Sequence, residues 1–276
     1  MKLLEKIFFV KNETKNSKKY KVLNLFGMKF SHKIGYVEVE DINFSEICQK
    51  YGQEFAEIYS KIRPYTMITE EAAFLNYQMI DYIENNNIEG DIVECGVWKG
   101  GSSMLMALTL IAKGNTSRKI YMYDTYEGMS EPTKEDITVL NENASEWFQQ
   151  QKETNEFVHG EKGWCEANIN IVKDNMKLTG YPIEKIEFVK GKVEDTIPRI
   201  LPNKIALLRL DTDWYESTLH EMNYLYPLVA KDSPVILDDY YYWVGSRKAV
   251  DEYLTQNNLK PLLVKAGTPA LIIKNY

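Results

Sequence analysis

Acidic residues end two apolar segments of the chain, and their spacing suits a metal site. The segments Ile205–Asp211 and Ser233–Asp239 finish in Asp211 and in the pair Asp238 and Asp239. If both segments are neighbouring parallel strands, these carboxylates converge and repel one another unless a cation or protons intervene. Hard oxygen ligands suit Mg²⁺, Mn²⁺ or Ca²⁺. We therefore predict that the three aspartates bind a divalent metal. The alternative is that they cap the helices that follow.

A glycine-rich turn follows a further apolar segment, Asp91–Val97. From Glu94 it reads ECGVWKGGSS, and its glycines allow a sharp turn and a close approach of the backbone to a ligand. Bulky Trp98 and the acid Glu94 distinguish it from the GxGxxG turn that binds pyrophosphate. A carboxylate here suits a cationic ligand, such as the sulfonium and amino groups of S-adenosylmethionine. We predict that Glu94 and Gly96 contact this donor; a turn without a ligand is the alternative.

Another acid, Asp124, ends the apolar segment Lys119–Asp124. An acid at the end of the second strand of such a sheet can accept both hydroxyls of an adenosine ribose. Its distance from Glu94 in the sequence is longer than the usual spacing of about 20 residues. We predict that Asp124 binds the ribose, with a surface or helix-capping acid as the alternative.

Strands that alternate with helices must position these acids. The pattern predicts an α/β fold with a doubly wound, mostly parallel, Rossmann-like sheet. We expect strands over residues 91–97, 119–124, 185–190, 205–211 and 233–239, two closing strands within 261–274, and helices over 69–84, 102–113, 216–228 and 246–254. Residues 1–62 are predicted to form an N-terminal arm with a hairpin near 21–37 and a helix near 44–62. Residues 63–276 form the catalytic domain, in which 129–180 is a lid-like insertion because it lacks the alternation.

Composition excludes several classes of protein. The chain has 276 residues, of which 33 are basic and 40 acidic, and its net charge is −7. Without a long basic run, nucleic acid is not an expected partner. Three cysteines without CxxC spacing favour a reducing compartment, and we expect a cytoplasmic location. No apolar stretch approaches the roughly 18 residues of a membrane span.

Taken together, these motifs resemble the macrocin O-methyltransferase (TylF/MycF-like) family of sugar O-methyltransferases. The resemblance rests on Tyr65-Thr66-Met67, on the residues 90–102 and 124–129, on Arg209 to Thr218, and on Asp238-Asp239-Tyr240 with the residues 247–251. It implies a class I methyltransferase fold, S-adenosylmethionine, Mg²⁺ or Mn²⁺, and a sugar or nucleotide-sugar acceptor. It implies metal ligation by Asp211, Asp238 and Asp239, and it implies donor contacts by Thr66, Met67, Glu94, Ser102, Asp124, Gly191, Lys192 and Val193.

The sequence departs from the family pattern at two places. Thr69-Glu70-Glu71-Ala72 stands where the family commonly has Ser-x-Glu-Arg. The basic stretch Lys18–Lys33 lies outside the pattern and is similar to the leaders of enzymes from bacterial capsule clusters. This similarity points to a surface-polysaccharide sugar, such as a heptose or its nucleotide conjugate. A homo-oligomer is compatible with the sequence, but no feature demands one.

The resemblance suggests roles in catalysis. A sugar hydroxyl is a poor nucleophile until a base or a metal lowers the cost of removing its proton. Asp211 is the first candidate for the general base, and His159 and His220 are alternatives. Sugar rings stack on aromatic faces, and we expect Tyr126 and Trp243 to face the acceptor.

Two other functions compete with this interpretation. Asp211-Thr212-Asp213 is also a D-x-D sequence, which in glycosyltransferases holds a metal and a nucleotide sugar. That function leaves Glu94, Gly96 and Asp124 without a role. A non-catalytic binding protein would not need the acid cluster.

Overall fold

The computed structural model describes residues 8–15, 18–25, 28–36 and 43–276, with side chains from residue 43 onward. Its contacts divide the chain into two compact units, Met1–Ile47 and Cys48–Tyr276. The sequence predicted a boundary at 62/63, and helix α2 (Gln53–Ile62), assigned there to the arm, lies in the second unit. Within the expected hairpin near 21–37, residues 26, 27 and 37 lie outside the described residues.

The first unit contains a three-stranded antiparallel sheet in the order β1-β2-β3. Its strands are β1 (Phe8–Lys15), β2 (Lys18–Leu25) and β3 (Met28–Tyr36). The hairpin of β2 and β3 agrees with the expected hairpin near 21–37. Strand β1 adds a third strand that the sequence analysis did not predict.

The second unit is built on a seven-stranded sheet in the order β6-β5-β4-β7-β8-β10-β9. Its strands are β4 (Asp91–Cys95), β5 (Ile120–Asp124), β6 (Ile186–Lys190), β7 (Ile205–Leu210), β8 (Ser233–Leu237), β9 (Leu263–Lys265) and β10 (Ala270–Lys274). Strands β4 to β8 pair in parallel, and β10 runs antiparallel to both β8 and β9. The predicted doubly wound, mostly parallel sheet is confirmed.

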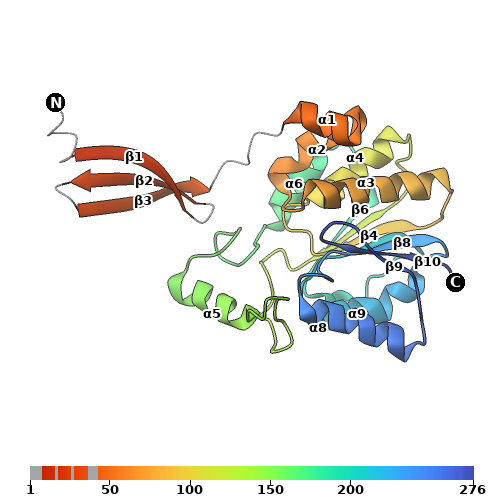
Figure 1. Cartoon of the computed structure of the whole chain (residues 1–276). Helices are drawn as coiled ribbons and strands as arrows, with labels where there is room; N and C mark the ends of the chain where they lie inside the picture. The colour runs from red at the N-terminus through yellow and green to blue at the C-terminus, as the bar shows by residue number, and fades with distance from the viewer. Residues whose placement is uncertain (1–7, 16–17, 26–27, 37–42) are drawn as a thin grey trace. The chain divides into compact units, whose positions relative to one another are not determined.

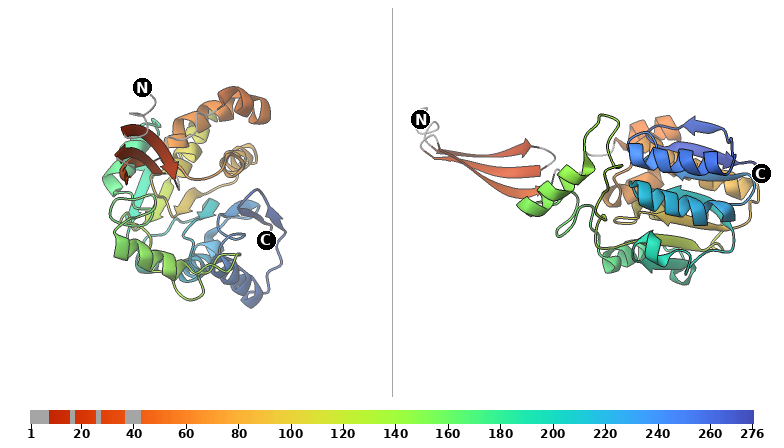
Figure 2. Two further views of the ribbon diagram at one scale, coloured as in Figure 1. Left: turned by 60° about the vertical axis from the view of Figure 1, so that its left-hand side comes forward. Right: turned by 90° about the horizontal axis from the view of Figure 1, so that it is seen from below.

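Helices cover both faces of this sheet. Helices α3 and α4 lie on one face, and α8 and α9 lie on the other (Figures 1 and 2). The α-helices, with α2 given above, are α1 (Phe44–Tyr51), α3 (Glu70–Asn85), α4 (Gly101–Ala112), α5 (Ala144–Thr154), α6 (Ile169–Lys177), α7 (Val193–Thr196), α8 (Tyr215–Tyr224) and α9 (Val244–Gln256). Thr69 caps α3 as expected, because its side chain accepts a hydrogen bond from Ala72 N at 3.2 Å.

Short 3₁₀ turns join some of these elements. They comprise Arg63–Tyr65, Ile183–Lys185 and Tyr226–Leu228. The sequence predicted one helix over 216–228. In the structure α8 ends at Tyr224 and the 3₁₀ turn Tyr226–Leu228 follows, because Pro227 has no N–H group to donate and cannot continue the α-helix.

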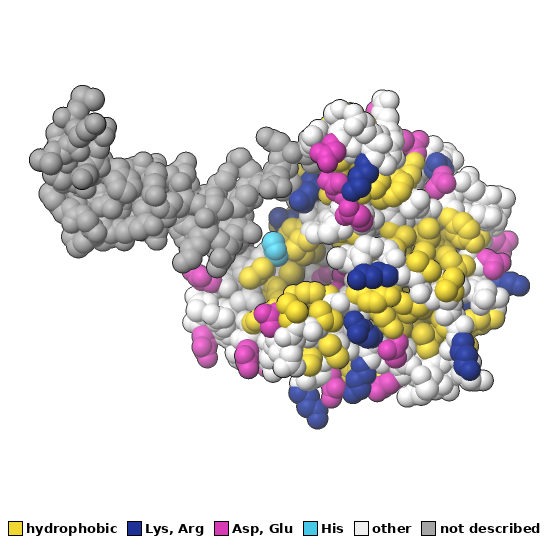
Figure 3. All heavy atoms as spheres, in the orientation of Figure 1, with side chains coloured by type: hydrophobic (Ala, Val, Ile, Leu, Met, Phe, Trp, Pro, Cys, Tyr) yellow, Lys and Arg dark blue, Asp and Glu magenta, His cyan; other side chains and the backbone are white. Residues whose placement is uncertain are grey.

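The core lies where the central strands are covered on both faces. Every residue of β7 and β8 is buried, which agrees with their apolar sequences. Arg209 is the exception to this apolar pattern in β7. On the face shown in Figure 3, single basic and acidic side chains are scattered among patches of apolar ones over the described surface. Among the described residues, no helix has both the length and the apolar composition that crossing a membrane requires.

The segment 129–180 is attached to the start of α9 by backbone pairing. Val139 N donates to Tyr242 O at 2.9 Å, and Val244 N donates to Ile137 O at 2.9 Å. Asp136, which is fully buried, accepts a hydrogen bond from Tyr215 N, the first residue of α8, at 2.7 Å. These contacts hold the base of the segment against the loops that follow β7 and β8.

Candidate active site

A cavity of about 640 Å³ opens at the carboxyl ends of the parallel strands. Hydrogen bonds that continue the strand ladders bring these ends together: Gly96 N donates to Tyr123 O, and Asp211 N donates to Cys95 O, both at 2.9 Å. The predicted site residues that line the cavity are Met67, Gly96, Asp124, Gly191, Lys192, Val193, Asp211, Asp238, Asp239 and Trp243. Glu94, Thr66, Ser102 and Tyr126 are not among its lining residues.

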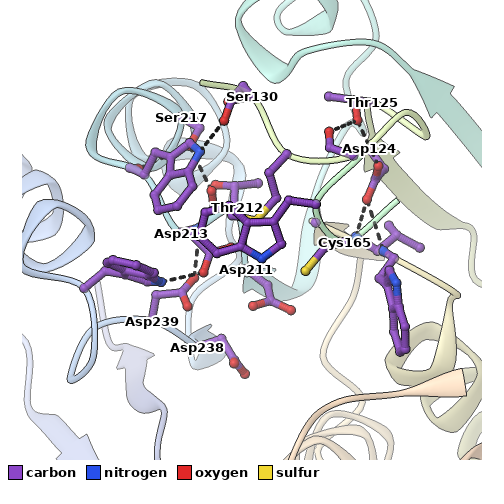
Figure 4. A pocket seen from close by; sticks show the side chains of 18 of the residues that line it. Asp124, Thr125, Ser130, Cys165, Asp211, Thr212, Asp213, Ser217, Asp238 and Asp239 are labelled. Carbon is purple, nitrogen blue, oxygen red and sulfur yellow. Dashed lines mark hydrogen bonds between the residues drawn. The ribbon is translucent and has the colours of Figure 1, made fainter. Parts of the chain in front are cut away.

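The three predicted metal ligands converge at one side of this cavity. Asp211 follows β7, and Asp238 and Asp239 follow β8, its parallel neighbour. One oxygen from each carboxylate lies within 4.8 Å of the others. Figure 4 shows these side chains pointing into the same space, with Asp124 on the opposite side of the pocket. Because the cluster takes Asp238 and Asp239 rather than Asp213, its geometry differs from that of a D-x-D pair.

A buried arginine lies beneath this acid cluster. Arg209 Nη1 donates to Glu94 Oε1 and to Asp211 Oδ2, both at 2.7 Å, and Arg209 Nη2 donates to Asp238 Oδ1 at 2.6 Å. Glu94 also accepts a hydrogen bond from Ser103 Oγ. Glu94 was expected to contact a cationic donor, but its carboxylate is 1% exposed and pairs with Arg209 instead.

The charges of this region are poorly balanced by the protein alone. In the described part of the chain, Arg209 is the cation that forms ion pairs with these acids. Burial raises the pKa of Asp211 and Asp239, and the neighbouring carboxylates raise it further. Burial, together with Asp211, also raises the pKa of Asp213 to about 8. The site therefore favours a bound cation or protons.

The glycine turn and Asp124 form the other side of the cavity. Asp124 Oδ2 accepts hydrogen bonds from Val97 N at 2.7 Å and Trp98 N at 3.1 Å, and its Oδ1 accepts one from Tyr126 N at 2.6 Å. Burial nevertheless raises the pKa of Asp124. The carboxylate thereby ties the turn after β4 to the end of β5.

Thr66 and Ser102, which were predicted to contact the donor, support the glycine turn outside the cavity lining. Thr66 is buried, and its side chain lies against the start of α4, where a Cβ on Gly101 would meet Thr66 Cβ at 2.6 Å. Ser102 is buried and accepts a hydrogen bond from Asn76 Nδ2 at 3.1 Å. These side chains position the N-terminus of α4 and do not line the cavity.

All five tryptophans of the chain line the cavity. Four of them form a closed ring of tilted and edge-to-face contacts, with centroid distances between 5.0 and 6.3 Å: Trp147, Trp164, Trp214 and Trp243. Trp243 Nε1 donates to Asp213 Oδ1 at 2.6 Å, which places the ring next to the acid cluster.

The expectation that Tyr126 faces the acceptor is wrong. Its side chain is 1% exposed, and its hydroxyl donates to Met122 O at 2.9 Å. The backbone at Tyr126 has φ 54°, so the chain turns sharply after Asp124 and directs the ring into the core.

The two histidines considered as bases have different positions. His159 lines the cavity, and burial, with a smaller effect of Lys99, lowers its pKa. His220 lies outside the cavity lining, and its Nε2 is 3.0 Å from Ile197 O. His159 therefore keeps access to a ligand and His220 does not.

Sequence reasoning missed Arg209, Trp147 and Trp98 as residues of the site. A signal for Arg209 was present, since it is a charged residue inside an otherwise apolar strand. No comparable signal marked Trp147, whose position depends on how the segment 129–180 folds back over the strand ends.

A buried glutamate behind the site predicts a pH-dependent stability. Glu221 is 0% exposed, hydrogen-bonds Thr212 Oγ1 at 3.0 Å, and has no ion-pair partner among the described residues. Burial raises the pKa of Glu221 well above the usual 4.5. As the pH rises above 4.5, the unfolded chain loses the proton while the folded state retains it, so the folded state becomes less stable relative to the unfolded chain. We expect Glu221→Gln to be more stable than the wild type at pH 8, by about 1–3 kcal/mol, with the difference vanishing near pH 4.

Urea unfolding at several pH values measures this difference. Glu216→Gln, an exposed position on the same helix, is the control and should leave the pH dependence unchanged. Equal pH dependence in Glu221→Gln and the wild type would contradict the prediction.

Comparisons with known proteins agree with this geometry. The chain is 31% identical over 161 residues to an 8-demethyl-8-(2,3-dimethoxy-alpha-L-rhamnosyl)-tetracenomycin-C 4'-O-methyltransferase of Streptomyces olivaceus, a match that covers 58% of this chain and 57% of that protein. It is 28% identical over 187 residues to demethyldecarbamoylnovobiocin O-methyltransferase of Streptomyces niveus, with 68% and 66% covered. The matches thus span less than two thirds of the length of these curated relatives.

A solved structure and a family model extend these matches. The structure of the O-methyltransferase NovP matches with a TM-score of 0.66 and 26% identity, covering 77% of this chain and 83% of that one. This likeness confirms the class I methyltransferase fold. The model of the macrocin O-methyltransferase (TylF) family matches residues 2–270. Because this match extends over nearly the whole chain, the protein belongs to the macrocin O-methyltransferase (TylF) family.

Proposed function

We propose that the protein is an S-adenosylmethionine- and divalent-metal-dependent O-methyltransferase that acts on a sugar hydroxyl. One observation carries the proposal: a single cavity has the glycine turn with Asp124 on one side and the cluster of Asp211, Asp238 and Asp239 on the other. A donor on the first side and an acceptor on the second would meet within one cavity. Family membership and the names of the relatives support the reaction class.

The donor side fits S-adenosylmethionine. Gly96 lines the cavity after β4, while Gly191, Lys192 and Val193 border it after β6. Asp124 presents a carboxylate that accepts hydrogen bonds, as the two hydroxyls of a ribose require. Met67 adds an apolar surface at the same cavity.

The carboxylate cluster fits Mg²⁺ or Mn²⁺. Its three ligand oxygens come from adjacent strand ends, and its charge exceeds what Arg209 neutralises. A bound divalent cation lowers the pKa of a hydroxyl that it contacts. Asp211 is the proposed base: it accepts the proton of the acceptor hydroxyl while the O–CH₃ bond forms and the S–CH₃ bond breaks.

The tryptophan ring fits a sugar acceptor. Trp214 and Trp243 lie beside the acid cluster, and Trp147 and Trp164 approach from the segment 129–180. Faces of this kind stack on the C–H surfaces of a sugar. We propose a sugar or nucleotide-sugar acceptor. A heptose of a surface polysaccharide and a cytoplasmic location remain predictions from the sequence, with which a homo-oligomer is compatible.

The glycosyltransferase alternative has less support. Its D-x-D sequence requires Asp211 and Asp213 to act together, but Asp213 Oδ1 accepts a hydrogen bond from Trp243 Nε1. The metal-type cluster uses Asp238 and Asp239 instead.

Replacing Asp124 tests the donor side. We expect Asp124→Ala to weaken S-adenosylmethionine binding about 100-fold, because two hydrogen bonds to a charged acceptor are lost. Calorimetry measures this change. Glu194→Gln, an exposed acid of the same cavity, is the control and should bind the donor like the wild type. Donor affinity that is equal in Asp124→Ala and the wild type would remove Asp124 from the site.

Methyl transfer tests the function as a whole. Isotope-labelled S-adenosylmethionine is incubated with the protein and a panel of free, glycosidic and nucleotide-linked sugars, with Mg²⁺ or with a chelator. We expect label in a sugar of the panel in the presence of Mg²⁺ and a large loss of transfer with the chelator. Transfer that is unaffected by the chelator would contradict metal dependence.

A further inference from the structure

Arg209 forms hydrogen bonds with one of the two carboxylate oxygens of Asp211 and with one of Asp238. Its side chain is 1% exposed and lies behind the carboxylates, away from the cavity lining. Its Nη1 donates to Oδ2 of Asp211, and its Nη2 donates to Oδ1 of Asp238. One oxygen of each carboxylate is therefore engaged before any ligand arrives.

The third carboxylate is engaged in the same way by the backbone. Asp239 Oδ2 accepts a hydrogen bond from Asp213 N at 3.0 Å. All three predicted ligands thus have one oxygen held by a protein N–H group, and one oxygen of each lies within 4.8 Å of the others.

The orientation of Arg209 is itself fixed by the sheet. Glu94 on β4 is the direct register partner of Arg209 on β7, and their side chains form an ion pair at 2.7 Å. Glu94 is held in turn by Ser103 at the start of α4. A planar guanidinium restrained at this end can present two N–H groups to two aspartates in a fixed geometry.

We propose that Arg209 is a positioning residue that, with the amide of Asp213, limits each aspartate to one metal-binding oxygen and makes the site selective for Mg²⁺ or Mn²⁺ over Ca²⁺. This inference rests on the metal site of the proposed function. Ca²⁺ takes six to eight oxygens and uses bidentate carboxylates, whereas Mg²⁺ takes six in a strict octahedron and keeps several waters. Three aspartates that each provide one oxygen therefore suit Mg²⁺.

The test compares the affinities of Mg²⁺ and Ca²⁺, measured by calorimetry without donor or acceptor. Removing Arg209 alone would leave Glu94 as an uncompensated buried charge. The variant is therefore the pair Arg209→Gln with Glu94→Gln. Its matched control is Glu94→Gln alone, in which the amide oxygen of the new side chain can still accept the hydrogen bond from Arg209 Nη1 and Arg209 keeps its contacts with Asp211 and Asp238.

We expect the ratio of Ca²⁺ to Mg²⁺ affinity to rise about 10-fold in the double variant, because the released carboxylates can bind Ca²⁺ through both oxygens. Glu94→Gln should keep the wild-type ratio. If Arg209 had a purely structural role, its loss would lower the affinities for Mg²⁺ and Ca²⁺ by the same factor. An unchanged ratio in the double variant therefore overturns the inference.

A measurement on the wild type keeps the inference testable if the double variant does not fold. Electron paramagnetic resonance of bound Mn²⁺ in ¹⁷O-labelled water reports the number of water ligands, and three single protein oxygens leave about three of the six positions to water. One or no water ligand would overturn the inference. Failure of the proposed function is separate: it appears as absent donor binding or methyl transfer, which these metal titrations do not use.

Discussion

Asp238→Asn should lower the rate of methyl transfer by about 10³-fold or more while leaving S-adenosylmethionine binding measurable. The substitution replaces a negatively charged proposed metal ligand with a neutral amide, which binds a divalent cation more weakly. Asp124 and the glycine turn lie on the opposite side of the cavity, so the donor keeps its contacts. Single-turnover transfer from labelled donor and calorimetric donor binding measure the two effects on the same protein.

Asp174→Asn provides the control for this experiment. Asp174 is an exposed residue of α6 that pairs with Lys177, so its replacement should change neither quantity. Full activity of Asp238→Asn in the presence of a chelator would contradict the metal site.

Gly96→Ala should have the largest effect on stability. Gly96 has φ +80°, and a Cβ at this position would lie 1.8 Å from the carbonyl oxygen of Asp211. The atom that the new Cβ meets is a backbone oxygen, directly after the adjacent strand β7, and it cannot rotate away, so the strands would have to separate. We expect a loss of about 3 kcal/mol or more in the free energy of unfolding, with a further loss of metal binding because Asp211 moves.

Gly114→Ala separates the two causes of this loss. Gly114 also has a positive φ, +72°, but a Cβ there meets nothing within 4 Å. It should lose only the conformational cost, about 1 kcal/mol. Urea unfolding measures both variants, and equal losses at Gly96 and Gly114 would show that the close approach of the strands does not matter.

Much of the site was predictable because acids that end parallel strands must meet at one edge of the sheet. Asp211, Asp238 and Asp239 follow this rule, and so does Asp124 at the end of β5. Thr69 was predictable as a cap because the hydrogen bond that it accepts is local.

The remainder depends on contacts between distant parts of the chain. Glu94 and Arg209 are 115 residues apart and meet through the register of β4 with β7, which no local pattern encodes. Glu94 was therefore expected in the cavity, although its carboxylate is buried beneath it. Tyr126 was misplaced because its direction depends on a single positive φ in a turn. Trp147 was not predicted because its place in the site depends on how the segment 129–180 folds.

A calorimetric titration of S-adenosylmethionine into the metal-free and the Mg²⁺-loaded protein, with a nucleotide sugar as the comparison ligand, decides between a methyltransferase and a glycosyltransferase. We expect the donor to bind in both states and its affinity to fall about 100-fold in Asp124→Ala. The contradictory result is absence of donor binding together with metal-dependent binding of the nucleotide sugar, which would favour a glycosyltransferase.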